Sequence, residues 1–135
     1  MAIQNPYQAY QTNTVNTASP GELTLMLYNG CLKFIKAARV AIESKQIQIR
    51  HENLLKAQNI INELRSTLNM DVAISRNMMA MYEYMYNRLV EANTKNDAAI
   101  LDEVEELVTE FRDTWKQAIQ LNRQKQFGSG GQVNV

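Results

Sequence analysis

The stretch SPGELTLMLY, residues 19–28, joins a helix start directly to an apolar run. Ser19 is a favourable N-cap, and Pro20 at the first helical position loses only an N–H that has no helical partner there. Glu22 completes the S-x-x-E capping box, in which the acidic side chain reaches back to the N-cap backbone. We therefore predict that a helix begins here and that the residues before it form a separate segment.

The composition favours a single all-helical domain. A chain of 135 residues has the size of one folding unit. No proline or glycine lies between Gly30 and Gly128, so nothing in that interval interrupts a helix. The 14 basic residues balance the 14 acidic ones, which provides no broad positive surface for nucleic acid or an anionic membrane.

The cellular compartment is predicted from the single cysteine and the N-terminus. Cys31 cannot form an intramolecular disulfide, and the first residues lack the charged start and apolar core of a secretory signal. No apolar run reaches the roughly 20 residues that a transmembrane helix needs. We expect a protein of the cytoplasm without membrane insertion.

Helical periodicity predicts four amphipathic helices, over residues 22–43, 49–69, 75–93 and 97–127. The connections are short, so consecutive helices should run antiparallel as neighbours in an up-down-up-down four-helix bundle. The bundle would span residues 19–127, between an N-terminal arm (1–18) and a flexible tail (128–135). The predicted core positions are Leu23, Met26, Leu27, Gly30, Phe34, Ala37, Ala38 and Ala41; Leu54, Ala57, Ile61, Leu64 and Leu68; Met78, Met81, Tyr82, Met85, Tyr86, Leu89 and Ala92; and Ile100, Leu101, Val104, Leu107, Val108, Phe111, Trp115, Ala118 and Ile119.

Some apolar residues fall outside these stripes and are predicted to face solvent. They are Leu25, Leu32 and Val40 on the first helix, Leu55 and Ile60 on the second, and Tyr84 on the third. Single exposed apolar residues are ordinary on protein surfaces, which is one interpretation of each position. Leu25 and Leu32 are seven residues apart and would form a ridge, so as a set these residues favour a binding groove for another chain.

The sequence contains no recognisable catalytic, metal or cofactor motif. A di-iron carboxylate site in a helical bundle needs E-x-x-H motifs, and the single histidine, His51, is not part of one. Cys31 has no histidine partner near it in the sequence, and the Gly128–Gly131 stretch lacks the lysine and following helix of a phosphate-binding loop. We predict no cofactor, and an enzyme is the remote alternative.

Five short motifs together resemble the FliS family of flagellar export chaperones, most closely its Bacillus-type members. They are NPYQAY (5–10), VNTASP (15–20), LMLYNG (25–30), NIINEL (59–64) and MYEYM (81–85). The resemblance implies a cytoplasmic four-helix bundle that binds the disordered C-terminal region of newly made flagellin. It also implies that the client, held in hydrophobic grooves on the outside of the bundle, stays unpolymerised until the flagellar type III machinery exports it.

The arm then has two interpretations. Asn5 and Pro6 are suited to start a short helical turn that places Tyr7 and Tyr10 on one face, with Ile3 beside them. The resemblance implies that this arm covers part of the client site in the free protein. The alternative is that both tyrosines are a permanent part of the fold.

The partners also leave alternatives open. Besides the flagellin C-terminal segment, the resemblance suggests export gate components and other flagellar regulators, with a free protein that is a monomer or a weak homodimer. A structural subunit that uses its leftover apolar surface for a fixed contact is the competing interpretation.

Overall fold

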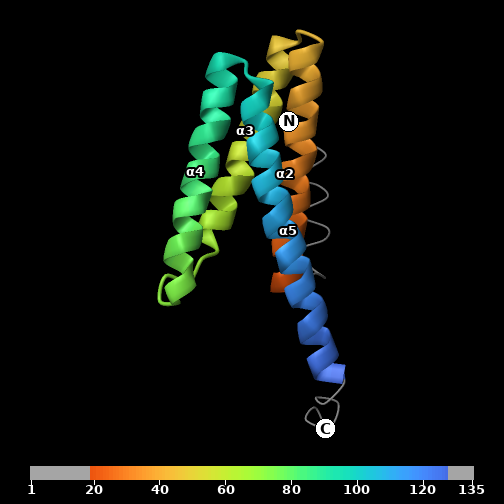
Figure 1. Cartoon of the computed structure of the whole chain (residues 1–135), viewed down its shortest axis with the longest axis vertical. Helices are drawn as coiled ribbons and strands as arrows, with labels where there is room; N and C mark the ends of the chain where they lie inside the picture. The colour runs from red at the N-terminus through yellow and green to blue at the C-terminus, as the bar shows by residue number, and fades with distance from the viewer. Residues whose placement is uncertain (1–18, 128–135) are drawn as a thin grey trace, which may run out of the picture.

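The computed structural model describes residues 19–127, which form four helices (Figure 1). Helix α2 spans Pro20–Glu43, α3 spans Ile47–Ser66, α4 spans Ala73–Lys95 and α5 spans Ala98–Phe127. Over this range the chain contains no strand. The predicted arm, residues 1–18, and tail, residues 128–135, lie outside the described residues.

The start of α2 has the predicted capping box. Ser19 Oγ accepts a hydrogen bond from the backbone N–H of Glu22 at 3.2 Å, and the Ser19 N–H donates to Glu22 Oε1 at 3.2 Å. Pro20 occupies the first helical position, where its missing N–H costs nothing. These two reciprocal bonds establish Ser19 as the N-cap of α2.

The helices run antiparallel and close into a four-membered bundle. The connections are residues 44–46, 67–72 and 96–97, each too short for anything but a reversal of direction. Helix α2 packs against α3 and α5, and α4 packs against the same two helices (Figure 1). Two reversals place a residue in the left-handed region, Lys45 with φ 60° and Asn96 with φ 55°. The predicted all-α up-down bundle is confirmed.

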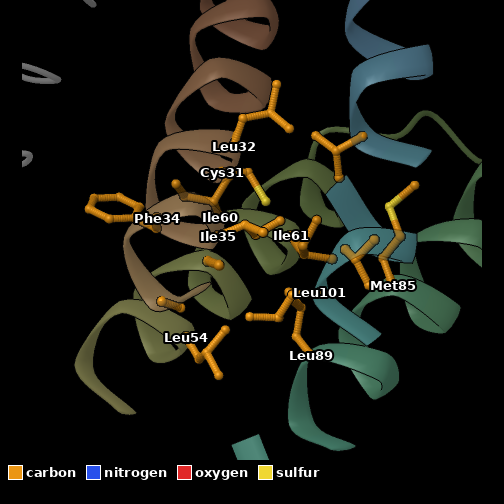
Figure 2. Packing of buried hydrophobic residues seen from close by; sticks show 14 of the residues in the cluster. Cys31, Leu32, Phe34, Ile35, Leu54, Ile60, Ile61, Met85, Leu89 and Leu101 are labelled. Carbon is orange, nitrogen blue, oxygen red and sulfur yellow. The ribbon is translucent and has the colours of Figure 1, made fainter. Parts of the chain in front are cut away.

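The core runs along the bundle axis and draws on all four helices. Figure 2 shows its middle, where Cys31 and Ile35 of α2 lie among Ile61 of α3 and Leu89 of α4. On α3 and α4 most predicted core positions are buried, including Leu54, Ile61, Leu64, Tyr82, Met85 and Leu89. On α5 the buried ones are Ile100, Leu101, Val104 and Val108.

The predicted face of α2 is confirmed at Leu27, Phe34, Ala38 and Ala41, which are buried, and needs correction at other positions. Leu32, expected to face solvent, is only 4% exposed and belongs to the core cluster. Gly30 and Ala37, expected in the core, are half-buried. Because α2 has a neighbour on each of two sides, α3 and α5, its buried arc is wider than the predicted stripe and includes Leu32.

On α3, Ile60 provides a second correction. This side chain, predicted to be exposed, is buried in the core cluster. The reason is the same, because α3 packs between α2 and α4 and one narrow stripe cannot serve both contacts.

Helix α5 has 30 residues and extends past the ends of its neighbours (Figure 1). Its first half supplies core residues, whereas Phe111, Trp115 and Ile119 are half-buried and Ala118, predicted in the core, is exposed. The apolar stripe therefore continues beyond the closed part of the bundle.

Candidate functional site: an apolar groove around Trp115

The second half of α5 is joined to the first turn of α2 by two contacts. The Trp115 indole N–H donates to the Gly21 carbonyl oxygen at 2.8 Å. Arg123 lies 2.7 Å from Glu22 Oε2. The pKa of Glu22 lies below its ordinary value because the Ser19 N–H and hydroxyl bond its carboxylate and Arg123 adds a positive charge. The capping box and the contact with α5 thus use the same carboxylate.

Trp115 stands between two hollows at this end of the bundle. One, of about 390 Å³, lies between the first turns of α2, the 67–72 connection and α4. The other, of about 450 Å³, lies between α4 and the second half of α5. Tyr28, Met78 and Trp115 line both. We call the two hollows together the Trp115 groove.

Apolar side chains make up most of the groove wall. They include Leu23, Leu68 and Val72 in the first hollow and Ile74, Phe111 and Ala118 in the second. Among the lining residues Glu110 is the one charged side chain. A concave apolar surface with few charges is suited to receive the apolar side chains of a peptide segment. Met78 is an unbranched, adaptable side chain, which helps such a wall adjust to different occupants.

Two tyrosines from facing helices form the floor of the groove. The hydroxyl oxygens of Tyr28 on α2 and Tyr82 on α4 are 2.6 Å apart and share a hydrogen bond. Phe111 of α5 packs edge-on against the Tyr28 ring at 6.4 Å and at a tilt against the Tyr82 ring at 5.9 Å. Burial raises the pKa of both tyrosines, so the two hydroxyls stay protonated at all ordinary pH values.

The six site residues predicted within the described range do not line this groove. Val40 is 61% exposed, Leu55 and Tyr84 are also exposed, and Leu25 is half-buried. Leu32 and Ile60 are core residues, as described above. Ile3, Tyr7 and Tyr10 lie outside the described residues.

Further exposed apolar side chains lie on the two helices of the α2–α3 hairpin. They are Val40, Ile47, Ile49 and Leu55, which we together call the hairpin surface. A hollow of about 270 Å³ adjoins it, lined by Ala41, Lys45, Gln46, Ile47 and Asn96. The sequence predicted Val40 and Leu55 as exposed and did not single out the two isoleucines, which stand near the start of α3.

Tyr84 belongs to a polar contact between α4 and α5. Its hydroxyl donates to Glu103 Oε2 at 2.5 Å, and Arg88 donates to Glu103 Oε1 at 2.8 Å. These bonds, first the tyrosine and then the arginine, lower the pKa of the Glu103 carboxyl. A partner that contacts the Tyr84 ring would do so beside an already paired hydroxyl.

The sequence missed the groove because its residues follow the core pattern. Met78, Phe111 and Trp115 were all predicted as core, and all three are half-buried. One signal was present, since the predicted fourth helix, at 97–127, is much longer than the others. The apolar stripe of such a helix is longer than shorter neighbours can cover completely.

The described residues contain neither a metal-binding cluster nor a helix suited to cross a membrane. In the range 19–127 no cluster of three or more His, Cys, Asp or Glu side chains is placed to hold a metal ion. None of the four described helices combines the length and apolar character that crossing a membrane requires. Cys31 is fully buried, and burial raises the pKa of its thiol to about 12. Its thiolate, the reactive form, is therefore scarce at neutral pH.

The fold and the groove define the class of the protein, a four-helix bundle with an apolar groove on its surface. Residues 3–122 match the model of the family described as flagellar protein FliS, and the chain belongs to this family. The family predicted from the motifs is thereby confirmed.

The relatives carry consistent names. The flagellar secretion chaperone FliS of Bacillus subtilis (strain 168) is 65% identical over 97% of this chain and 98% of its own length. The proteins of the same name from Vibrio cholerae and Salmonella typhimurium are 34% and 37% identical, over 85% and 78% of this chain and 89% and 80% of theirs. The predicted function, that of a flagellar secretion chaperone, is confirmed by these matches.

A solved structure supports the fold. The crystal structure of a bacterial flagellar chaperone superimposes with a TM-score of 0.71 at 18% identity. The alignment covers 86% of this chain and 98% of that one. The four-helix arrangement is thus shared at low sequence identity.

Proposed function

We propose that this chaperone binds the C-terminal region of newly made flagellin in the cytoplasm and keeps it unpolymerised until export. The observation that carries the proposal is an open, apolar, almost uncharged groove in a chain 65% identical to the Bacillus subtilis secretion chaperone over nearly its whole length. The role is one of binding, with no catalytic step and no cofactor.

The mechanism follows from the cost of ordering a disordered segment. A client that folds on binding loses conformational entropy, which the burial of its apolar side chains must offset. The Trp115 groove offers apolar side chains that the bundle itself leaves half-buried, among them Met78 and Phe111. Covering the client's apolar side chains there withholds them from contacts with other flagellin molecules.

The hairpin surface and the arm make up the second part of the proposal. The arm residues Ile3, Tyr7 and Tyr10 compete with the client for apolar area on α2 and α3, where Val40 and Leu55 are exposed. Each binding event then includes displacement of the arm, so the apparent affinity falls by the fraction of molecules with the surface uncovered. Leu25 and Tyr84 are further candidates for client contact.

The chain's one tryptophan, Trp115, supplies the first test because it lines both hollows. A peptide of the flagellin C-terminal region should shift the emission of Trp115 to shorter wavelength as it excludes water from the indole. A peptide of equal length from elsewhere in flagellin is the control. No binding of the C-terminal peptide by fluorescence and calorimetry would refute the proposed client.

Two variants test the surfaces separately. Ala118→Asp places a charge in the wall of the second hollow at an exposed position, so it should weaken peptide binding and leave the thermal midpoint nearly unchanged. Leu55→Asp does the same on the hairpin surface. Gln117→Asp, at an exposed position next to Ala118 that lines neither hollow, is the matched control. Undiminished affinity in both test variants would exclude these surfaces.

Deletion of residues 1–18 tests the arm. We expect client affinity to rise or hold while the helical circular dichroism signal is kept. A large loss of affinity would mean that the arm contacts the client directly. A loss of helicity would mean that the arm is a permanent part of the fold.

A homodimer or a fixed subunit contact is the second candidate, favoured by the same exposed apolar residues on the hairpin, such as Ile47. Size-exclusion chromatography with light scattering, with and without the peptide, separates the two functions. A dimer that is indifferent to the peptide supports the structural role. Capture experiments with flagellin and with flagellin lacking its C-terminal region extend the test to the whole client protein. The same capture experiment with export gate components and with other flagellar regulators tests those partners.

A further inference from the structure

One carboxylate interrupts the apolar wall of the second hollow. Glu110 is an exposed residue of α5, and the other side chains that line this hollow are uncharged. Within residues 19–127 the Glu110 side chain takes part in no ion pair. Residues 1–18 and 128–135 contain no Lys or Arg. A cation for Glu110 is therefore supplied neither by the described bundle nor by a basic side chain at either end of the chain.

The carboxylate stands at one end of a continuous edge of the hollow. Glu110, Thr114 and Ala118 line it at intervals of four residues, so they follow one another along the same face of α5. Ile74 and Met78 of α4 line the hollow as well. The helical rise places Ala118 about 12 Å along the axis from Glu110. The α5 edge is thus charged at one end and apolar at the other.

An occupant that covers this edge changes the surroundings of the carboxylate. Removing water from an ionised group costs free energy unless an opposite charge or a hydrogen-bond donor takes the place of the water. Lys and Arg are suited to this place, because their methylene groups cover apolar surface while the charged head reaches a carboxylate at the rim. An acidic residue of the occupant at the same place would be repelled by Glu110.

We propose that Glu110 pairs with a Lys or Arg side chain of the groove's occupant and thereby sets the direction and register of the occupant along α5. The basic residue lies at the Glu110 end, and an apolar residue of the occupant covers Ala118 and Trp115 at the other end. This inference rests on the proposed function, in which the occupant is the flagellin segment. It adds a requirement for charge to the requirement for apolar side chains.

The first test is Glu110→Gln, which removes the charge and keeps the size of an exposed side chain, so the thermal midpoint should change little. Affinity for the flagellin C-terminal peptide, measured by calorimetry at low salt, should fall about three-fold, as expected for the loss of a rim ion pair. Glu106→Gln is the matched control, since Glu106 is an exposed acid one turn earlier on α5 and lines neither hollow. It makes the same change in net charge and should keep the wild-type affinity. An equal loss in both variants would overturn the inference, because net charge alone would then explain it.

Peptide variants identify the residue that pairs with Glu110. Each Lys or Arg of the peptide is replaced by Gln in turn, and each peptide is measured against the wild-type protein and against Glu110→Gln. One replacement should lower the affinity for the wild-type protein and leave the affinity for Glu110→Gln unchanged, because the two groups act as a pair. Additive losses at every basic position would overturn the inference, and so would wild-type affinity in Glu110→Gln. Failure of the wild-type protein to bind the unaltered peptide would instead overturn the proposed function.

Discussion

The burial of Leu32 and the exposure of Val40 on α2 can be tested with two alanine substitutions. Leu32 and Val40 both belong to the outward set predicted from the sequence, yet the structure buries Leu32 to 4% exposure and leaves Val40 at 61%. We predict that Leu32→Ala destabilises the protein strongly and that Val40→Ala does not.

The magnitude for Leu32→Ala follows from its burial. Almost the whole side chain lies in the core cluster, so truncation loses the transfer free energy of the removed carbons and leaves a cavity. Buried Leu→Ala changes cost about 2.7–5 kcal/mol, and we take about 3 kcal/mol for a site at the edge of the core. For a domain of this size that loss corresponds to a fall of about 10 °C in thermal midpoint.

Val40→Ala provides the control on the same helix. An exposed site has no core packing to lose, and alanine is the better helix former by a few tenths of a kcal/mol, so stability should hold or rise slightly. Urea unfolding followed by circular dichroism at 222 nm measures both variants. Equal losses of unfolding free energy in the two variants would refute the α2 orientation. The same comparison can be made on α3, where Ile60→Ala should lower the unfolding free energy more than Leu55→Ala does, because Ile60 is buried and Leu55 is exposed.

Three further predictions concern the cap, the buried thiol and a surface carboxylate. Ser19→Ala removes the acceptor for the Glu22 N–H and should lower the unfolding free energy by about 1 kcal/mol, measured by urea titration. Cys31, buried and with its thiol pKa raised to about 12, should react with a disulfide reagent at pH 8 only as fast as the protein opens, and a rapid reaction in folded protein would contradict its burial. Glu103 has a pKa lowered by the Tyr84 hydroxyl and by Arg88, so its contribution to stability is complete above the ordinary value of 4.5 and is lost as the pH falls through the lower folded value. The thermal midpoint of Glu103→Gln should therefore fall less than that of the wild type between pH 5 and strongly acidic pH, and parallel curves would show that the carboxylate contributes nothing.

The features that the sequence predicted well are those set by neighbours along the chain. The capping box at Ser19 involves atoms three residues apart, so the local sequence determines it. The helices and their antiparallel order follow from uninterrupted helix formers and connections of only a few residues. The family follows from short motifs whose order along the chain is specific. None of these requires knowledge of how the helices pack.

Packing decides what the sequence did not predict. The buried arc of α2 depends on two neighbours at once, and a stripe drawn on an isolated helix gives no information about the angle between them, which is why Leu32 was misplaced. Ile60 fails for the same reason on α3. The groove depends on where α2 begins and where the 67–72 connection ends relative to α5. The spacing of apolar residues along α5 predicts neither of these positions.

The groove also shows how one helix serves both stability and binding. The first half of α5 contributes Leu101 and Val104 to the closed core, whereas Phe111 and Trp115 continue the same stripe beside the first turns of α2, where they are only half-buried. Apolar area that the fold leaves half-buried contributes little to its own stability and remains available as binding free energy for a partner. The Trp115 indole bond to Gly21 holds this part of α5 against α2 beside the two hollows. A preformed groove loses less entropy on binding than one that must be assembled, which leaves the ordering cost with the disordered partner.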